Sequence, residues 1–427
     1  MLQTQTLREN TEDILIRLEK RGDNNLKNLV AQALDVEKKK REKQAESDAL
    51  LAEMNKASKE IGSLMQSGKR EEAESAKAKV AEIKAKSQEM KQEFASLEAA
   101  LNDVLYQIPN VPNEAVPSGK TEDDNEEVFR EGELPTMADN AKAHWDLANE
   151  YKLIDFQTGV KITGAGFPLY TGKGAKLQRA LINFFLDEAE KSGYDEVIPP
   201  FVVNEDSGYG TGQLPDKEGQ MYHITEDDLY LIPTAEVPIT NIYRDVILNL
   251  DKLPIKHCGY SPCFRREAGS YGKDVRGLNR LHQFEKVEIV QISRPEESYK
   301  LLDEMVDHVK GLLKKLELPY RVLRLCGGDL GFAAAITYDF EVYSAAQKRW
   351  LEVSSVSNFE AFQSNRLKCR YRSEEKKTEL VHTLNGSAMA LPRIMAALLE
   401  NNQVGDGIVI PAALQDYTKF SKIEKIK

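Results

Sequence analysis

The chain has 427 residues, of which 41% are hydrophobic and 30% are charged, and this length allows two or three domains with a sizeable buried core. Its 58 Lys and Arg face 69 Asp and Glu, a formal net charge of −11. Because phosphate affinity comes largely from clustered cations, this balance argues against a general, non-specific nucleic-acid binder. A local basic surface that binds one shaped RNA is still compatible with it.

The sequence contains no apolar run of the roughly 18–20 residues that cross a bilayer, and its N-terminus lacks the basic start and apolar stretch of a signal peptide. Its four cysteines form no C-x-x-C pair and no Cys/His cluster with zinc spacing. We therefore expect a reduced, cytoplasmic chain with no membrane partner and no structural metal site.

Residues from about 26 to 108 are nearly free of Pro and rich in Ala, Glu, Lys, Gln and Leu, a composition that favours long helices. Two runs repeat every seven residues in alternating steps of three and four, which is typical of a coiled-coil seam. The seam positions are Leu29, Ala33, Val36, Lys40, Lys43, Ser47, Leu50, Met54, Ala57, Ile61 and Leu64, then Val80, Ile83, Ser87, Met90, Phe94, Leu97, Leu101, Val104 and Ile108. We expect the two helices to pair antiparallel as an arm, reversing at 68–70.

The seam also predicts a register for this arm. If Leu64 meets Val80 and Met54 meets Met90, the numbers of all facing residues add up to 144. Two interpretations remain open for the polar seam positions Lys40, Lys43 and Ser47. Either the lysine stems lie along the seam with their ammonium groups in water, or this stretch packs on the rest of the chain and the seam is interrupted.

A helical hairpin of this kind is most often a dimerisation element or a spacer, but its charge suggests a further role. Residues 36–100 carry 14 Lys/Arg and 13 Asp/Glu, whereas the remainder carries 44 and 56. The arm is therefore the least acidic part of the chain.

Three prolines between Ile108 and Gly119 end the helical region, and short strand-like and helical runs alternate after them. The spacing predicts a helix over 175–191, stopped by Gly193, a strand over 196–203 and another over 339–343. Residues 264–288 (FRREAGSYGKDVRGLNRLHQFEKVE) place two strand-like ends around a loop rich in Gly and Arg. Arg presents a planar fork that suits phosphate oxygens, and Phe284 offers a face on which a base can stack.

This segment resembles motif 2 of the class II aminoacyl-tRNA synthetases, in the form carried by seryl-tRNA synthetases. The resemblance is collinear over most of the chain. Its other segments are motif 1 (193–200), the triplet Thr234-Ala235-Glu236, the ATP and magnesium segment Glu352–Phe359, motif 3 (385–400), the helical arm and the IPNVP linker at 108–112.

The resemblance implies an α+β fold with an N-terminal antiparallel coiled-coil arm and a class II catalytic domain built on an antiparallel β-sheet flanked by helices. It implies a tRNA-binding domain over 1–115, a catalytic domain over 116–427 and a homodimer formed through motif 1. The implied activity is ATP-dependent formation of seryl-adenylate from L-serine and transfer of serine to tRNA(Ser), with tRNA(Sec) as a further substrate in the family. The implied cofactors are ATP, as a substrate, and Mg²⁺.

Residue roles follow from the same resemblance. Arg265, Glu352 and Arg393 are expected to be catalytic, with Arg265 at the α-phosphate and Arg393 toward the γ-phosphate, while Glu352 and Ser355 bind Mg²⁺. The expected ATP site comprises Arg265, Arg266, Glu267, Phe284, Glu352, Val353, Ser354, Ser355 and Arg393. The expected serine site comprises Thr234, Ala235, Glu236, Arg265, Glu288, Asn385 and Ser387.

Other interpretations of the same residues are possible. Arg265 and Arg393 could form structural ion pairs, and Glu288 could pair with Lys286 or Arg280. At the level of function, one alternative is a paralogue that loads a small amino acid onto a carrier protein, although such relatives usually lack a full arm. Another is a non-enzymatic coiled-coil protein, which the presence of Arg265, Glu288, Glu352 and Arg393 argues against.

Overall fold

The computed structural model describes residues 1–136, 141–216, 218–267 and 276–425. The chain forms two compact units. The helical unit comprises Leu2–Glu19 and Asp23–Pro109, and the sheet unit comprises Met1, Lys20–Gly22 and Asn110–Lys427. Within the described ranges, no helix is both long enough and apolar enough to cross a membrane.

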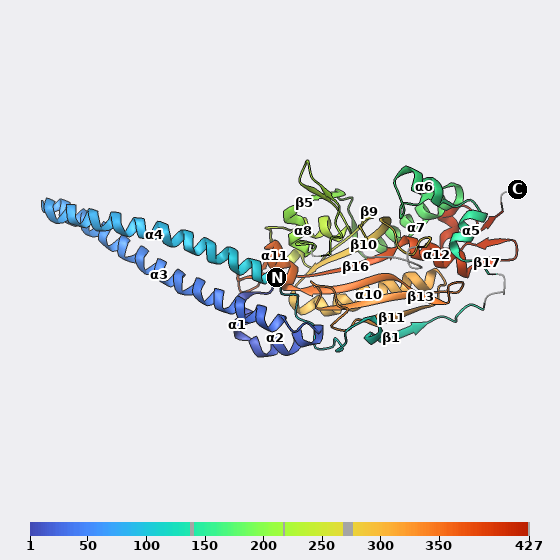
Figure 1. Ribbon diagram of the computed structural model, residues 1–427, viewed down its shortest axis with the longest axis horizontal. Coiled ribbons are helices and arrows are strands. Elements are labelled where there is room, and N and C mark those ends of the chain that lie inside the picture. The colour runs from blue at the N-terminus through green and yellow to red at the C-terminus, as the bar shows by residue number, and fades with distance from the viewer. Residues whose placement is uncertain (137–140, 217, 268–275, 426–427) are drawn as a thin grey trace. The chain divides into compact units, whose positions relative to one another are not determined.

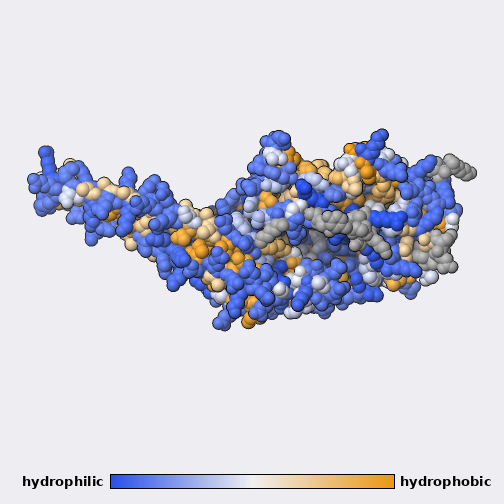
Figure 2. All heavy atoms as spheres, viewed as in Figure 1, coloured by the Kyte–Doolittle hydropathy of each residue, from blue (hydrophilic) through white to orange (hydrophobic). Residues whose placement is uncertain are grey.

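The helical unit is built around the predicted antiparallel hairpin of long helices (Figure 1). Two short helices, α1 (Thr4–Glu9) and α2 (Thr11–Leu18), pack against the start of α3 (Leu26–Gln66). The chain reverses at Ser67–Lys69, where Gly68 has a φ of +76° that favours glycine, and returns as α4 (Arg70–Leu105). On the face shown in Figure 2, hydrophilic residues cover most of the half of the hairpin that ends in this turn.

The predicted register of the hairpin is wrong by about one heptad. Because α3 ends at Gln66 and α4 begins at Arg70, the numbers of facing residues add up to about 136 at the turn, and not to 144. In the interhelical ion pairs these sums lie between 132 and 138. The pairs are Lys40–Glu98 (2.7 Å), Lys43–Glu93 (3.1 Å) and Lys79–Glu53 (2.8 Å).

The structure also decides between the two interpretations of the polar seam positions. Lys40, Lys43 and Ser47 are half-buried among exposed neighbours, so they lie on the seam. The Lys40 ammonium lies 4.9 Å from the centre of the Phe94 ring while it pairs with Glu98. The lysine stems therefore cover the seam and their charges reach α4 carboxylates at its edge.

The largest sheet of the sheet unit has eight strands in the order β1-β11-β12-β13-β16-β10-β9-β4. All neighbouring strands are antiparallel except β4 and β9, which are parallel. In sheet order the strands are β1 (Glu126–Glu131), β11 (Tyr320–Arg324), β12 (Ile336–Ser344), β13 (Arg349–Glu360), β16 (His382–Ala390), β10 (Gln283–Ser293), β9 (Ile255–Phe264) and β4 (Asp195–Glu196).

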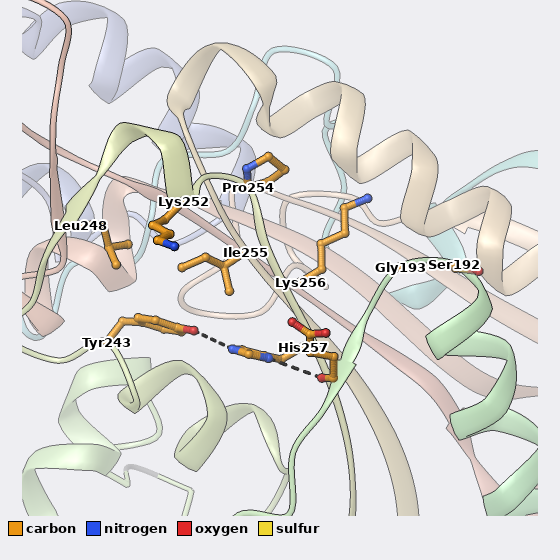
Figure 3. A pocket seen from close by; sticks show the side chains of 10 residues that line it. Ser192, Gly193, Tyr243, Leu248, Lys252, Pro254, Ile255, Lys256 and His257 are labelled. Carbon is orange, nitrogen blue, oxygen red and sulfur yellow. Dashed lines mark hydrogen bonds between the residues drawn. The ribbon is translucent and has the colours of Figure 1, made fainter.

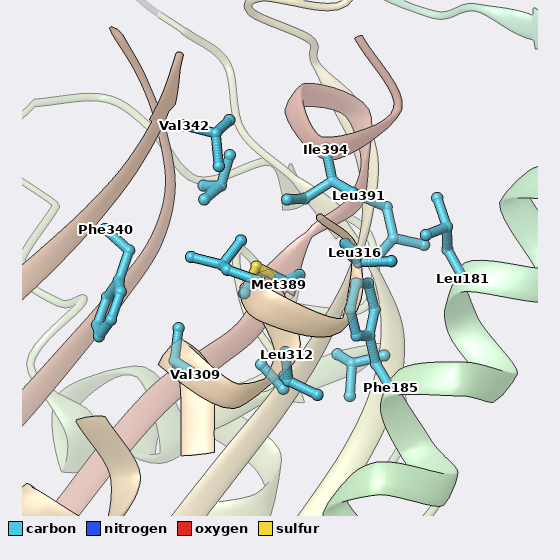
Figure 4. Packing of buried hydrophobic residues seen from close by; sticks show 14 of the residues in the cluster. Leu181, Phe185, Val309, Leu312, Leu316, Phe340, Val342, Met389, Leu391 and Ile394 are labelled. Carbon is cyan, nitrogen blue, oxygen red and sulfur yellow. The ribbon is translucent and has the colours of Figure 1, made fainter. Parts of the chain in front are cut away.

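Three amphipathic helices pack on this sheet: α7 (Gly172–Lys191), α10 (Ser298–Lys315) and α12 (Leu391–Asn401). Their apolar side chains pack with those of the strands into one large cluster (Figure 4). The cluster brings Phe185 of α7 and Leu312 of α10 together with Met389 of β16. Burial of such side chains contributes roughly 1.5–3 kcal/mol each.

The remaining elements form smaller sheets and short helices around the main sheet. The smaller sheets contain β2 (Ile154–Asp155) with β3 (Leu169–Tyr170); β5 (Val202–Asn204), β7 (Leu229–Leu231) and β6 (His223–Ile224); β15 (Thr378–Leu380), β14 (Arg370–Arg372) and β8 (Ile247–Asn249); and β17 (Gln403–Val404), β18 (Gly407–Val409) and β19 (Lys422–Glu424). The short helices are α5 (His144–Glu150), α6 (Phe156–Ile162), α8 (Glu205–Thr211), α9 (Glu236–Asn241), α11 (Ala361–Leu367) and α13 (Ala412–Thr418).

Two sequence predictions for this unit differ in outcome. The helix predicted over 175–191 is present as α7, and Gly193 follows it with a φ of +84°. The strand predicted over 196–203 is wrong as a single element, because the chain is extended into strands only at β4 and β5. Pro199 and Pro200 lie between them and have no N–H group to donate to a neighbouring strand.

Strand β10 separates an apolar from a polar face of the sheet. Val287 and Ile289 point into the cluster beneath the helices. The alternate residues Lys286 and Glu288 therefore point to the opposite face, since side chains alternate along a strand. Both are buried.

Candidate active site

The predicted serine-site residues meet around the carboxylate of Glu288, which has no exposed surface. Thr234 Oγ1 donates a hydrogen bond of 2.9 Å to Glu288 Oε2, and Asn385 Nδ2 donates one of 3.3 Å to Oε1. The Lys286 ammonium lies 2.5 Å from Oε2. Ser387 is the residue of β16 that faces Glu288 in the strand pairing. Five residues from three segments thus form one polar cluster, the candidate serine pocket.

The triplet Thr234–Glu236 reaches this pocket because the chain before it runs beside the end of β9. The Phe264 N–H donates to Ile232 O at 2.9 Å, and Arg265 Nε donates to Pro233 O at 3.4 Å. Ala235 is fully buried and caps the N-terminus of α9, which begins at Glu236.

Glu236 is a second buried carboxylate in the pocket. Its Oε1 accepts a hydrogen bond of 2.7 Å from Gln363 Nε2. Burial, followed by the nearby charge of Glu288, raises the pKa of Glu236 to about 7. This carboxylate therefore changes its charge near neutral pH, and a bound cation would favour its ionised form.

Arg265 and Phe284 lie together at the open end of the β9–β10 hairpin. The Arg265 N–H bonds His282 O at 2.9 Å, and its guanidinium carbon lies 5.2 Å from the centre of the Phe284 ring. Glu267 has a φ of +48° and pairs with Arg280 at 2.8 Å. Positions 268–275, including Lys273 of the predicted loop, lie outside the described residues.

Arg266 points elsewhere from Arg265, as expected for consecutive residues of an extended chain. Its N–H donates to Gln220 O at 2.8 Å, and its guanidinium carbon lies 5.7 Å from the centre of the Tyr222 ring. Arg265 and Arg266 therefore contact different walls of the site.

Glu352 and Arg393 form a second cluster on β13 and α12. Arg393 Nη1 lies 2.7 Å from the backbone oxygen of Glu352 and 3.3 Å from its Oε2, and Arg393 Nε donates to Asn279 O at 3.1 Å. Arg393 comes two residues after the start of α12, so the helix fixes its direction. The two residues keep a guanidinium and a carboxylate at the surface of the site.

The residues between Glu352 and Ser355 serve different surfaces. Val353 is 1% exposed and its side chain belongs to the apolar cluster, so only its backbone faces the site. Ser354 Oγ donates to the backbone oxygen of Ser387 at 2.5 Å, which ties β13 to the serine-site strand β16.

Glu352 and Ser355 offer oxygen ligands of the kind that Mg²⁺ prefers. Ser355 donates a hydrogen bond to Asp339, whose pKa is raised well above its ordinary value by burial and then by the charge of Glu352. Asp339 Oδ1 is buried without a hydrogen-bond partner, which fits a cation close by. In the described part of the chain, no group of three or more His, Cys, Asp or Glu is placed to hold a metal ion. A cation here would therefore need ligand oxygens from a bound phosphate as well.

Sequence reasoning did not assign four polar residues to this site, although it named Lys286 as a possible partner of Glu288. Lys286 lies two residues before Glu288 on β10, so strand alternation is the signal that places both on one face, and Asp339 faces Ser355 in the pairing of β12 with β13. Gln363 lies 127 residues from Glu236, and Asn279 lies 114 residues from Arg393. No local pattern points to either of them.

A surface hollow of about 650 Å³ lies away from these residues, beside motif 1 (Figure 3). Gly193 and Asp195 line it together with Tyr243, Lys256 and His257. Tyr243 Oη and His257 Nε2 are 2.5 Å apart within it. None of the predicted ATP or serine residues lines this hollow.

Comparison with known proteins gives a consistent result along the whole chain. Residues 1–112 match the model of the seryl-tRNA synthetase N-terminal domain, and residues 221–402 match that of the class II tRNA synthetase core domain of the G, H, P, S and T enzymes. A serine–tRNA ligase of Salinibacter ruber is 51% identical over 425 residues, which make up 99% of each chain.

Two solved structures are similar to the whole chain. The seryl-tRNA synthetase of Pyrococcus horikoshii, complexed with ATP, has a TM-score of 0.93 and 35% identity and covers 100% of both chains. The cytoplasmic serine–tRNA ligase of Naegleria fowleri, in complex with AMP, has a TM-score of 0.88 and 26% identity, covering 100% of this chain and 99% of that one.

Proposed function

The chain belongs to the seryl-tRNA synthetase family, and we propose that the polar face of its β10 and β16 strands joins serine to tRNA in two steps. Its activity is that of a serine–tRNA ligase. In the first step the serine carboxylate attacks the α-phosphate of ATP, giving seryl-adenylate and pyrophosphate. In the second, a terminal ribose hydroxyl of tRNA takes the seryl group and AMP leaves.

The observation that carries the proposed substrate is the hydrogen-bonded carboxylate of Glu288 at the closed end of the pocket. Glu288 accepts from the serine hydroxyl, with Asn385 and Ser387 beside it. A buried acceptor left without this hydroxyl is costly, and a site of this kind can reject the analogue without the hydroxyl by roughly 10⁴-fold. Alanine is therefore a poor substrate.

The amino end of serine lies toward Thr234, Ala235 and Glu236. The ammonium group pairs with Glu236, whose pKa of about 7 means that pairing draws the carboxylate into its ionised form. Arg265, at the edge of the same pocket, holds the serine carboxylate next to the α-phosphate. The serine carboxylate is already an anion, so the step needs alignment and charge stabilisation and no general base.

ATP occupies the space between the β9–β10 hairpin and the N-terminus of α12. Its adenine stacks on Phe284, Glu267 contacts the adenine or ribose side, and Arg266 lines the wall near Tyr222. Arg265 stabilises charge that develops on the α-phosphate, and Arg393 binds toward the γ-phosphate. The backbone of Val353 and Ser354 completes the wall beside Glu352.

Glu352 and Ser355 would hold Mg²⁺ through oxygen ligands, which suit this cation. The unpartnered oxygen of Asp339 supports this assignment. When bound, the cation neutralises charge on the phosphates. Arg265 and Arg393 orient the phosphates and stabilise the remaining charge.

The helical arm provides the contact with tRNA, through phosphate and sugar groups of tRNA(Ser), and of tRNA(Sec) where that tRNA is present. We assign tRNA binding to residues 1–115 and catalysis to 116–427. The near-neutral charge of the arm in an acidic chain supports this division.

A homodimer forms through motif 1. Ile198 is 83% exposed in the single chain, and Val202, Ile242 and Ile247 are further exposed apolar side chains of neighbouring segments. We also infer a cytoplasmic location, since all four cysteines are free and buried in the described structure.

The test of this function is ATP–pyrophosphate exchange with serine, threonine, alanine, glycine and cysteine. We expect exchange with serine at a rate at least 10³-fold above that with alanine. Exchange with glycine or alanine but not with serine would favour a paralogue that activates another small amino acid.

A pair of arginine variants tests the site assignment. Arg265→Ala should lower serine-dependent exchange by about 10²–10³-fold, the usual effect of removing a group that stabilises transition-state charge. Arg130→Ala is the matched control, because Arg130 pairs with Glu127 on the edge strand β1 and lies outside the proposed site. Unchanged exchange in Arg265→Ala would contradict the role assigned to Arg265.

A further inference from the structure

His144, the first residue of α5, is a fully buried histidine with a partner on each ring nitrogen. Its Nδ1 lies 2.7 Å from Glu400 Oε1, and its Nε2 lies 2.8 Å from the backbone N of Leu278. A backbone N–H can only donate, so Nε2 must be the acceptor. Nδ1 therefore carries the proton and donates it to the carboxylate, and the ring is neutral.

Glu400, in the last turn of α12, accepts several hydrogen bonds besides the one from the His144 ring. It also accepts from the His144 N–H at 2.9 Å, from Gln347 Nε2 at 3.1 Å and from the hydroxyl of Ser344. Burial disfavours its charge, but the bond from His144 and those from its other donors outweigh burial and lower the pKa of Glu400. The carboxylate is held rigidly, and it orients the ring of His144.

On its other side, His144 contacts residues 277 and 278, which lie shortly before β10. Gly277 has a φ of +66°, and a Cβ added there would lie 2.2 Å from His144 Nε2. Only glycine therefore allows the Leu278 N–H to reach the ring. Leu278 and Asn279 are both buried, so packing holds this segment in place.

The same segment contacts Arg393 of the proposed ATP site. The backbone oxygen of Asn279 accepts from Arg393 Nε at 3.1 Å, and Asn279 Nδ2 donates to Gln347 Oε1 at 3.0 Å. Gln347 also bonds Glu400. The hydrogen bonds therefore form a closed network that runs from Glu400 through His144, Leu278, Asn279 and Gln347 back to Glu400. Arg393 is attached to this network by its hydrogen bond to the Asn279 oxygen.

We propose that His144 is a positioning residue for ATP: by accepting the Leu278 N–H it fixes the Asn279 carbonyl, which in turn aims the Arg393 guanidinium at the far end of the nucleotide. His144 contacts no substrate itself. The inference rests on the proposed function only in taking ATP as the ligand of Arg393.

Two substitutions separate the two hydrogen bonds of the His144 imidazole, one to Glu400 and one from Leu278. In His144→Asn, the amide nitrogen takes the place of Nδ1 and still donates to Glu400, but nothing accepts from Leu278. In His144→Gln, the longer side chain places an amide oxygen near the position of Nε2, so the Leu278 N–H keeps an acceptor. A purely structural role for His144 predicts similar defects in both variants.

The measurements are the KM for ATP and for serine in pyrophosphate exchange, and the ATP dissociation constant by calorimetry. We expect His144→Asn to raise the ATP constants by about 3- to 10-fold, the effect of losing one hydrogen bond, with the serine KM unchanged. His144→Gln should restore them to within about 2-fold of the wild type. His382→Asn, at a half-buried histidine that bonds Ser298, is the control for loss of a histidine elsewhere.

Gly277→Ala tests the contact from the opposite side and leaves the His144–Glu400 bond in place. It should weaken ATP binding like His144→Asn, and it keeps the inference testable if His144→Asn does not fold. Equal ATP affinity in His144→Asn, Gly277→Ala and the wild type would overturn the inference, as would equal losses in His144→Asn and His144→Gln. If the wild type shows no serine-dependent exchange, the proposed function fails, whereas the calorimetric contrast still decides the role of His144.

Discussion

Lys286 Nζ and Glu288 Oε2 lie 2.5 Å apart on the same face of β10, and neither side chain is more than 7% exposed. Two residues apart on a strand, they point the same way and form a buried ion pair in the proposed serine site. The sequence interpretation that paired Glu288 with Lys286 or Arg280 was therefore correct for Lys286, while Arg280 pairs with Glu267. The same carboxylate also bonds Thr234, so the ion pair and the proposed serine site share one group.

The buried pair makes a prediction about stability. Lys286→Met leaves Glu288 as an uncompensated buried charge, and we expect a loss of about 3–5 kcal/mol in the free energy of unfolding. The double variant Lys286→Met with Glu288→Gln removes the charge as well and should recover most of this loss. Urea denaturation of the four chains of this double-mutant cycle measures the coupling, and additive effects would show that the pair does not interact.

Glu236 gives the stability a defined pH dependence. Its pKa is raised from the ordinary 4.5 to about 7, so between these values the folded chain keeps a proton that the unfolded chain has released. Raising the pH through this window therefore favours unfolding, by up to about 3 kcal/mol from this group. In Glu236→Gln this contribution should be absent. The check is the difference in unfolding free energy between the wild type and the variant from pH 4.5 to 8, and a constant difference would contradict it.

Serine affinity should change in the opposite direction over the same range. If the ammonium of serine pairs with ionised Glu236, the free enzyme must release a proton before it binds below pH 7. The apparent serine dissociation constant should then fall about 10-fold from pH 6 to pH 8. Glu236→Gln should bind serine weakly at every pH, and calorimetric titrations of both chains distinguish the two patterns.

The sequence predicted the helices of the arm and their seam, but not which residues face one another. A seam that repeats every seven residues is equally well satisfied by facing numbers that sum to 137 or to 144. The choice depends on where the chain reverses, and Ser67–Lys69 forms a turn of only three residues between the two helices. Seam composition does not contain that information.

For the candidate site, collinear motifs predicted roles for Glu288, Glu352 and Arg393, and the structure places these residues in two polar clusters. The residues that orient them could not be predicted, because their contacts depend on the completed fold. Gln363 of α11 bonds Glu236, and Glu400 bonds His144, from which it is 256 residues distant in the sequence. Such partners have no fixed spacing in the sequence.

The corrected register allows a shortened arm that keeps its seam intact. Removing residues 50–63 from α3 and 74–87 from α4 deletes two heptads from each helix, and it retains the turn at Ser67–Lys69. The arm becomes shorter by about 21 Å, at a rise of about 1.5 Å per residue. A control with 50–63 and 74–80 removed takes two heptads from α3 but only one from α4, so the seam beyond the deletions is out of register by one heptad.

The shortened chain separates the two proposed activities. We expect serine-dependent pyrophosphate exchange to stay within about 2-fold of the wild type, since the residues of the catalytic site all lie in the sheet unit. Charging of tRNA should fall by at least about 100-fold, because contacts along the arm supply binding energy that the catalytic site cannot replace. Loss of helical signal in the out-of-register control, but not in the matched deletion, would show that the two helices depend on their mutual seam. Equal loss of exchange and charging in the matched deletion would mean that the arm supports the fold and does not select the tRNA.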